Sequence, residues 1–434
     1  MRIAIIGGGI GGLYSGYFLS KKGFKVTIFE KDKELGGLLG SYKIGKTHLE
    51  KYYHHFFNTD NKLIELIKEL GLTDKIIKKR TDVGFAYKNR LIKCSTPLDL
   101  MKFNCLGLID RLRLGLSVLR LKYMKNGSKI DKISAKEWLT KNAGYRSYKA
   151  IWEPLLKIKF GDDYQNISAA WVWGRISTRL NSRKRIKEEL FYLKGGFKTL
   201  VDKLSKRIKD NKGNIINEKV NSIEKDKKKF IINNNHKFDK IVLTVPSKQI
   251  TNMYKWPNDF IESLNKIKYK SVVCMTLELK EPLSDIYWTN VLDDNNPLSI
   301  IIEHTNMINK KSYGSNIVYL ANYISQDSSL MKMKNYDLLK HYCKGLRNIY
   351  PKFSENIIKN YYVTKNNFGT PIYDKNYFEK ILPLNTPIKG IYVVNTSQIF
   401  PFDRSINFSI KMAKKYSSTI VKYIEKDNLE INKE

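Results

Sequence analysis

The chain has 434 residues, of which 42% are apolar and 28% charged. This composition is typical of a globular protein and argues against a mainly disordered, fibrous or polytopic membrane chain. The 78 Lys and Arg residues exceed the 42 Asp and Glu residues by 36. Because the lysines are spread along the chain, we interpret this excess as a basic solvated surface, with a specific anionic partner as the alternative.

Four cysteines are present, and no two of them are close in the sequence. This usage is typical of a reducing compartment and argues against a zinc or iron–sulfur site built from cysteine, so no metal is expected. No run of about 18 apolar residues occurs, so no membrane-spanning helix is expected. The apolar N-terminus lacks the cleavage site of a signal peptide. We therefore expect a cytoplasmic protein.

The first residues predict a strand, a glycine-rich turn and a helix. Arg2–Ile6 is a short apolar run typical of a buried parallel strand. It leads into a G-x-G-x-x-G pattern through Gly7, Gly9 and Gly12, and helical spacing follows over residues 13–21. The first glycine permits the tight turn, the second lets a pyrophosphate approach the backbone, and the third lets helix and strand pack. The helix N-terminus offers free N–H groups to the phosphates.

A second predicted strand, Lys25–Phe29, ends at Glu30, which lies 23 residues after Gly7. At this spacing a carboxylate can accept hydrogen bonds from both ribose hydroxyls of a dinucleotide, and it repels a 2′-phosphate. Strand, turn, helix, strand and acidic end occur in this order. They predict a site for FAD or NAD rather than NADP, with a turn that binds no ligand as the alternative.

A second glycine-rich turn follows directly. The Glu30-x5-Gly36-Gly37 spacing resembles the second FAD motif of the amine oxidase and protoporphyrinogen oxidase-like flavoprotein superfamily. In that superfamily the turn runs beside the flavin and its ribityl chain. The resemblance therefore implies FAD as the cofactor. It implies five cofactor-binding residues in this segment, which are Lys31, Gly36, Gly37, Gly40 and Ser41.

The resemblance continues along the chain. It is carried by residues 49–57, 152–161, 192–197, 241–246 and 390–407. Val220, with Ile223, is similar to the strand whose backbone meets the adenine. After its last strand the superfamily has Gly-Asp, with the aspartate on the ribityl hydroxyls, whereas this chain has Asn395-Thr396 after the predicted strand Ile391–Val394. The resemblance implies that Asn395 or Thr396 binds the ribityl chain without a carboxylate.

The expected fold is α/β, with a Rossmann-like FAD-binding domain and an interleaved α+β substrate domain. The strand and helix at the end of the chain need the N-terminal sheet as their partner. The FAD-binding domain is therefore expected to combine residues 1–60, 190–250 and 380–434. Residues 61–189 and 251–379 are expected to form the substrate-binding domain.

A helix is expected to begin near Asn407, with Asn407 or Ser405 as its cap. The family resemblance places the N-terminus of this helix at the N1–C2=O edge of the flavin, where it stabilises the negative charge of the reduced ring. Asn407 is accordingly a predicted cofactor-binding residue. An ordinary capped helix that packs on the sheet is the alternative.

Residues 97–126 combine apolar and basic side chains near helical spacing. The apolar set is Leu98, Met101, Leu106, Ile109, Leu112, Leu116 and Leu119, and the basic set is Arg111, Arg113, Arg120, Lys122 and Lys125. A basic amphipathic helix pair can lie on an anionic membrane surface, as in membrane-attached relatives of the superfamily, which would place the protein at the inner membrane face. We favour the alternative, a stripe that packs on the core with a solvated basic face.

The flavin carries the redox chemistry, so the protein has to position a substrate C–H bond over N5. His54 and His55 are the candidates for proton transfer, because imidazole titrates near neutrality. Adjacent residues on a strand point to opposite faces, so one of the two is expected to meet the cofactor; a structural role is the alternative for each. Arg404 is the candidate for binding an anionic substrate group, and a contact with Asp403 or a loop carbonyl is its alternative.

These features predict an FAD-dependent oxidoreductase that oxidises a small, amphiphilic or lipid-linked substrate by hydride transfer to flavin N5. The alternative is a flavin-dependent nucleotide-sugar mutase resembling UDP-galactopyranose mutase, in which reduced flavin acts without net redox change. A third hypothesis is a basic FAD-containing module that binds membrane or nucleic acid. The even spread of charge argues against it, and no specific nucleic acid is expected.

Overall fold

The computed structural model describes residues 1–95, 99, 106–182 and 189–431. Its first layer is a parallel five-stranded sheet with the strand order β10-β2-β1-β14-β20. These strands are β1 (Arg2–Ile6), β2 (Lys25–Glu30), β10 (Asn214–Asn217), β14 (Lys240–Leu243) and β20 (Ile391–Val393). The strands predicted near the two ends of the chain are confirmed, and both pair with β14.

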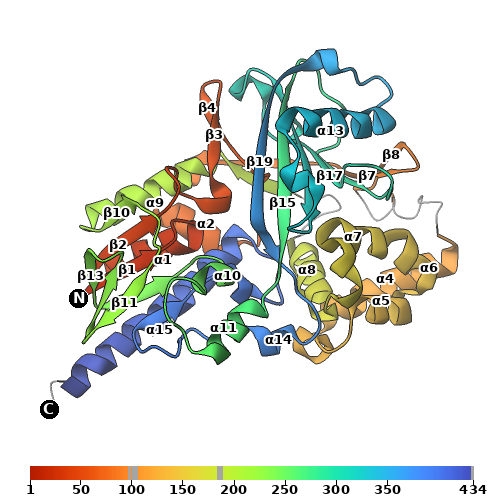
Figure 1. Cartoon of the computed structure of the whole chain (residues 1–434). Coiled ribbons are helices and arrows are strands. Elements are labelled where there is room, and N and C mark those ends of the chain that lie inside the picture. Colours follow the sequence, from red (N-terminus) through yellow and green to blue (C-terminus); the bar gives the residue numbers. More distant parts are fainter. Residues whose placement is uncertain (96–98, 100–105, 183–188, 432–434) are drawn as a thin grey trace.

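Strand β1 is apolar from Ile3 to Ile6, where both of its faces are buried. Ile3 and Ile5 pack into one hydrophobic cluster, and Ala4 and Ile6 pack into another. The first face is covered by α1 (Ile10–Lys21), α9 (Lys198–Asp210) and α15 (Ile406–Ile431), and α1 packs on both other helices. The second face carries the antiparallel sheet of β11 (Ile223–Asp226), β12 (Lys229–Ile232) and β13 (His236–Phe238). Figure 1 shows the N-terminal strands β1 and β2 and the C-terminal helix α15 in the same part of the molecule.

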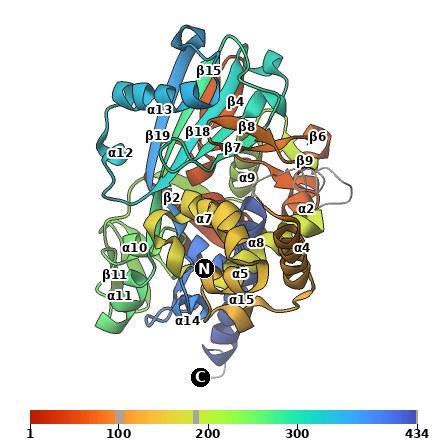
Figure 2. The ribbon, with the colours of Figure 1, turned by 90° about the vertical axis from the view of Figure 1, so that its right-hand side faces the viewer.

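A second, mixed sheet has the order β19-β15-β18-β17-β16-β7-β8. Its strands are β7 (Val83–Tyr87), β8 (Arg90–Lys93), β15 (Tyr269–Leu279), β16 (Trp288–Val291), β17 (Ile300–Glu303), β18 (Asn316–Ile324) and β19 (Ile358–Pro371). Helix α13 (Asn335–Ile349) lies against this sheet in both views (Figures 1 and 2), where Leu338 and Tyr342 share a cluster with Met275 and Leu277.

The remaining elements connect and flank the two sheets. One group of helices consists of α4 (Leu108–Tyr123), α5 (Ala135–Ala143), α6 (Tyr145–Ser147), α7 (Glu153–Phe160) and α8 (Ala169–Ser182). Strands β3 (Ser41–Ile44) and β4 (Thr47–Glu50) form a hairpin, and β9 (Glu189–Leu193) pairs with β5 (Phe56–Phe57) and β6 (Ile76–Arg80). The other helices are α2 (Asn61–Glu69), α10 (Ser247–Ile250), α11 (Asn258–Asn265), α12 (Ser329–Lys332) and α14 (Tyr377–Lys380). In the described part of the chain, no helix has the length and apolarity to cross a membrane.

The α/β class with a parallel sheet is thus confirmed. All five described strands of the parallel sheet fall within residues 1–60, 190–250 and 380–434, and the described strands of the mixed sheet fall within 61–189 and 251–379. The exact bounds of the two domains stay a prediction.

Helix α4 corrects the expectation that the apolar stripe of residues 97–126 packs on the core. Ile109, Leu112 and Leu116 are 74%, 62% and 65% exposed, whereas Leu114 and Leu121 pack inward. The helix buries a narrower face than its apolar residues cover, because only one side of it meets α5 and α8. Leu98 and Met101 lie outside the described residues.

Candidate cofactor and active site

The first glycine turn leaves the N-terminus of α1 open. Gly7 has a φ of 109°, and a Cβ at Gly12 would lie 2.0 Å from the Gly7 carbonyl oxygen, so only glycine permits this packing. The N-cap of α1 is Gly9, and neither a capping side chain nor an acidic residue occupies the first turn. A Cβ at Gly9 would have one neighbour within 4 Å, the Gly36 carbonyl oxygen at 4.0 Å. The first N–H groups of α1 thus remain accessible to an anion.

The second glycine turn packs directly on the first. The Gly36 N–H donates to the Gly8 carbonyl oxygen at 2.8 Å, and Gly36 forms a parallel bridge with Gly9. Gly36 and Gly37 have φ values of 111° and 58°, which favour glycine. A Cβ at Gly37 would lie 3.3 Å from the Gly9 Cα, so the two backbones touch. The two motifs identified in the sequence therefore form one structural unit.

The predicted residues that follow this turn extend the same unit. The Gly40 N–H donates to the Gly37 carbonyl oxygen, and Ser41, which is buried, begins β3. The Lys31 side chain is exposed, and its ammonium lies 3.5 Å from the Asp32 carboxylate. The backbone of this segment, rather than the Lys31 side chain, is what lies against the first turn.

The Glu30 carboxylate lies beside the first glycine turn. It is 8% exposed and accepts from the Gly8 N–H at 2.7 Å and the Asp32 N–H at 3.0 Å. Each carboxylate oxygen retains a lone pair, so both can also accept from ribose hydroxyls. Asn217, which no sequence motif marks, donates through its side-chain amide to the carbonyl oxygens of Glu30 and Asp32 and ties β10 to this edge.

Val220 is buried but lies on the loop between β10 and β11. The strand expected there begins later, at Ile223, whose N–H donates to the Met253 carbonyl oxygen. The prediction of a strand at Val220 is therefore wrong. A backbone contact with adenine from this loop stays a prediction.

The Asn395 side chain is saturated by contacts within the protein. Its Oδ1 accepts from the N–H and hydroxyl of Ser397, and its Nδ2 donates to the Val245 carbonyl oxygen and the Ser247 Oγ. An amide has two donors and two acceptor sites, so none remains for a ribityl hydroxyl. The structure therefore corrects the expectation for Asn395, which caps a 3₁₀ turn at residues 396–399. Thr396, which is half-buried in that turn, stays a prediction.

Asn407 caps a different helix from the one expected. Its Oδ1 accepts from the N–H groups of Lys62 and Leu63 at 2.9 and 3.1 Å, which caps the N-terminus of α2. The cap of α15 is Ser405, whose Oγ accepts from the Phe408 N–H. Of the two predicted caps, Ser405 is thus confirmed and Asn407 is wrong. The contact with α2 was hidden from the sequence because it joins positions 345 residues apart.

His54 and His55 lie in a loop between β4 and β5, so the orientation expected from a strand is wrong. The Nδ1 atom of His54 is 2.7 Å from the Tyr52 carbonyl oxygen, and that of His55 is 3.1 Å from the Tyr287 hydroxyl. Burial lowers the pKa of His54 to about 4 and that of His55 to about 3. Both imidazoles are therefore neutral near pH 7 and are not acids at that pH.

A second polar cluster was missed because its members are far apart in the sequence. The Arg404 guanidinium donates to the Tyr323 hydroxyl at 3.2 Å. The Tyr53 hydroxyl lies 3.4 Å from the Tyr323 hydroxyl. The Lys159 ammonium sits 4.7 Å from the centre of the Tyr323 ring. Burial raises the pKa of Tyr323, but the Lys159 and Arg404 cations outweigh it, so the net shift is downward.

The alternative contact between Arg404 and Asp403 is formed only by the backbone. The Asp403 carboxylate pairs with Lys159 at 3.2 Å and Arg175 at 2.7 Å, and it accepts from the Arg404 backbone N–H. The Arg404 Nε is buried and has no hydrogen-bond partner among the described residues. A buried N–H without a partner is costly, so this atom suits an acceptor supplied by a ligand.

The family model described as flavin-containing amine oxidoreductase matches residues 10–394. An uncharacterized protein of Methanocaldococcus jannaschii is 30% identical over 257 residues, which cover 56% of this chain and 58% of that protein. Coproporphyrinogen III oxidase of Staphylococcus aureus is 25% identical over 293 residues, which cover 58% and 62%. The chain therefore matches less than two thirds of the length of these relatives.

Solved structures resemble the whole chain. A protein from Exiguobacterium sp. 255-15 has a TM-score of 0.78 at 16% identity, with 96% of this chain and 98% of that chain covered. A reduced UDP-galactopyranose mutase has a TM-score of 0.73 at 15% identity, with 97% and 96% covered. At these identities the likeness concerns the fold alone.

Proposed function

Since the chain belongs to the family of flavin-containing amine oxidoreductases, we propose that it is an FAD-dependent oxidoreductase acting on a small or amphiphilic substrate. One observation carries the proposal: the second glycine turn is bonded to the first, beside Glu30 and the open N-terminus of α1. When bound, the flavin supplies the acceptor for a hydride from the substrate. The chain itself has to bind and orient the substrate and to transfer protons.

The cofactor would be held mainly by backbone groups. The N–H groups at the start of α1 would bind the pyrophosphate, and Glu30 would accept from the ribose hydroxyls. The turn at Gly36 and Gly37 would run beside the ribityl chain, where Thr396 remains the candidate side chain. The family match and the contact between the two turns support these roles.

The substrate would be oriented by Arg404. Its unpartnered Nε can donate to a carboxylate or carbonyl oxygen, while its Nη2 donates to the Tyr323 hydroxyl. Tyr323 is the proposed proton-transfer group, because two neighbouring cations favour its phenolate. This assignment replaces the histidines as the leading candidates, since burial lowers the pKa of both so far below 7 that they are weak bases.

The absorbance spectrum of the purified protein tests the proposal. We expect flavin bands, release of FAD on denaturation, and anaerobic bleaching by at least one member of a panel of amines, porphyrinogens and polyenes. A protein without flavin bands after reconstitution with FAD would refute the proposal. Turnover of a UDP-sugar by the reduced protein without an electron acceptor would instead establish the mutase alternative, which the fold likeness alone does not favour.

Variants of Arg404 separate binding from folding. Arg404→Lys keeps a charge but loses the fork of donors, and we expect KM to rise at least tenfold with little change in FAD content. Arg175→Lys is the matched control, because Arg175 pairs with Asp403 and not with Tyr323. Equal KM values for Arg404→Lys and the wild type would reject the substrate-binding role.

The exposed face of α4 supports a further part of the proposal, a peripheral contact with an anionic membrane surface. Leu108, Ile109, Leu112, Leu116 and Tyr123 are 62–75% exposed on this helix. Four basic residues share α4 with a single acidic one, Asp110. Apolar side chains flanked by cations match the acyl boundary and the anionic headgroups of a bilayer.

Sedimentation with vesicles tests this contact. We expect binding to vesicles containing phosphatidylglycerol, weaker binding to phosphatidylcholine alone, and loss of binding in a Leu112→Ser/Leu116→Ser variant. Tyr336→Ser is the matched control, because Tyr336 is 58% exposed on a different helix, α13, which packs on the mixed sheet. Equal sedimentation of the wild type and the α4 variant would reject the contact.

A further inference from the structure

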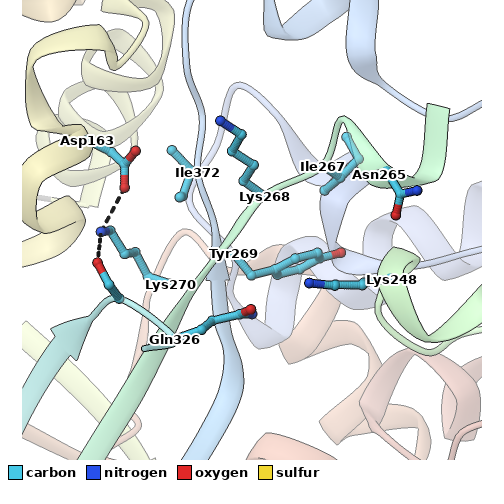
Figure 3. Close-up of a pocket in the computed structure, with 10 residues that line it drawn as sticks. Asp163, Lys248, Asn265, Ile267, Lys268, Tyr269, Lys270, Gln326 and Ile372 are labelled. Atoms are coloured by element: carbon cyan, nitrogen blue, oxygen red, sulfur yellow. Dashed lines mark hydrogen bonds and ion pairs between the residues drawn. The ribbon is translucent and has the colours of Figure 1, made fainter. Parts of the chain in front are cut away.

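A cleft of about 400 Å³ lies where three parts of the chain meet. Tyr269 and Lys270 line it from the start of β15, Asp163 lines it from the turn after α7, and Lys248 lines it from α10 (Figure 3). Its volume lies within the usual range for small-molecule sites. Neither the flavin motifs nor the Arg404 cluster includes these residues.

The charge of the cleft is unbalanced. Its charged lining consists of Lys248, Lys268, Lys270 and Asp163. Asp163 compensates Lys270, since the two groups lie 2.7 Å apart, and the Lys270 ammonium also donates to the Ser325 Oγ at 3.1 Å. Within the described residues, Lys248 and Lys268 form no ion pair. Two positive charges therefore remain uncompensated on the lining of the cleft, both on exposed side chains.

Lys270 shows that the cleft is built rather than a chance gap between surface lysines. Its side chain is only 2% exposed although it carries a charge. Gly161, with a φ of 52°, places its backbone so close that a Cβ there would lie 3.2 Å from the Lys270 Nζ. The ammonium is thus held in place by Asp163, Ser325 and the chain at Gly161. This part of the cleft is therefore fixed, whereas Lys248 and Lys268 are exposed beside it.

The cleft also has an apolar wall. The ring of Tyr269 and the side chains of Ile267 and Ile372 line it. The Tyr269 hydroxyl is hydrogen-bonded to the N–H and hydroxyl of Ser247, the first residue of α10. The cleft therefore offers an apolar surface next to a surplus of two cations.

We propose that this cleft binds a small molecule that carries two negative charges on an apolar body, as a phosphate monoester or a dicarboxylate does. The doubly charged group pairs with Lys248 and Lys268, and the apolar body packs on Tyr269. The site is independent of the flavin, so its test does not depend on the proposed oxidoreductase activity.

Calorimetric titration of the purified protein in 150 mM salt tests the proposal with phenyl phosphate and with phthalate as probes. We expect at least one probe to bind, and the probe that binds decides between phosphate monoester and dicarboxylate. Phenol, which lacks the charges, is expected not to bind. Absence of binding for both anionic probes would overturn the proposal.

A Lys248→Gln/Lys268→Gln variant is expected to weaken the binding at least tenfold with an unchanged unfolding temperature. The matched control is Lys206→Gln/Lys209→Gln, which removes two exposed lysines from α9 and the same amount of charge. We expect this control to bind the probe as the wild type does. Equal weakening in the two variants would mean that general charge attracts the probe, and it would refute the cleft as the site.

Discussion

The Glu50 carboxylate accepts a hydrogen bond from the Tyr192 hydroxyl inside the core, although the two residues are 142 positions apart. Its other oxygen accepts from the Phe197 N–H. Gly196 fits against it because a Cβ there would lie 2.8 Å from the carboxylate. Residues 49–57 and 192–197, two separate segments of family resemblance, thus meet at one buried carboxylate, which joins β4 to β9.

This carboxylate makes stability depend on pH. Burial raises the pKa of Glu50 from 4.5 to about 7, against the opposing effect of its hydrogen bonds. Because the folded pKa exceeds the unfolded one, the folded state binds this proton more tightly. The resulting stabilisation is fully present below pH 4.5 and is lost as the pH rises to 7.

We therefore expect the unfolding free energy of the wild type, relative to Glu50→Gln, to fall by up to about 3 kcal/mol between pH 4.5 and pH 8. Urea unfolding across this range measures the difference. Glu262→Gln, on the exposed side of α11, is the control. Stability curves for wild type and Glu50→Gln that run parallel over the whole range would contradict the assignment.

Gly9→Ala is expected to abolish cofactor loading without unfolding the chain. Gly9 has a φ of −69°, which alanine adopts freely, and its Cβ would enter the space before the first turn of α1. We expect FAD content to drop at least tenfold while the unfolding temperature of the apoprotein stays unchanged. Gly115→Ala in α4, where the new Cβ has no neighbour within 4 Å, is the control. Normal FAD content in Gly9→Ala would argue against a pyrophosphate at this turn.

Glu30→Ala is expected to weaken FAD binding, because it removes the acceptor for the ribose hydroxyls. Titration of the apoprotein with FAD, followed by flavin fluorescence, measures the change, and we expect a loss of at least tenfold. Asp32→Ala is the matched control, since the Asp32 carboxylate is exposed and only two positions away. Wild-type affinity in Glu30→Ala would refute the ribose assignment.

Asn407→Ala distinguishes a cap from a flavin ligand. Loss of the cap on α2 is expected to lower the unfolding free energy by about 1 kcal/mol. We expect FAD affinity to remain within twofold of the wild type, because the known contacts of its side-chain oxygen are with Lys62 and Leu63. Urea unfolding and FAD titration measure the two effects. A variant with normal stability and weak FAD binding would restore Asn407 as a flavin ligand.

Local sequence patterns explain why the parallel sheet and its glycine turns could be predicted. The strand Arg2–Ile6, the turn at Gly7 and the helix that follows are contiguous, so spacing and glycine chemistry are sufficient to identify them. The strand Ile391–Val393 was also predictable, because an apolar run of this kind needs a sheet to bury both of its faces. The two glycine turns both lie within the first 37 residues of the chain.

The side-chain contacts of the site were decided by the tertiary structure. Asn395, Asn407 and His55 were assigned from their positions in motifs, yet each is bonded to a partner that depends on the folded chain. The face of α4 that is buried is a similar case, because an apolar stripe at helical spacing has the same sequence pattern whether it packs on a core or faces solvent.

The sequence alone determined the family and the parallel sheet, and it predicted a place for the adenine dinucleotide at the glycine turns, since these depend on backbone conformation over neighbouring residues. Only the folded chain brought Arg404 to Tyr323, 81 positions away, and left the guanidinium Nε without a partner. It likewise gathered Lys248, Lys268 and Lys270 around one cleft. Such contacts depend on how separate elements pack, and no local spacing of residues encodes that packing.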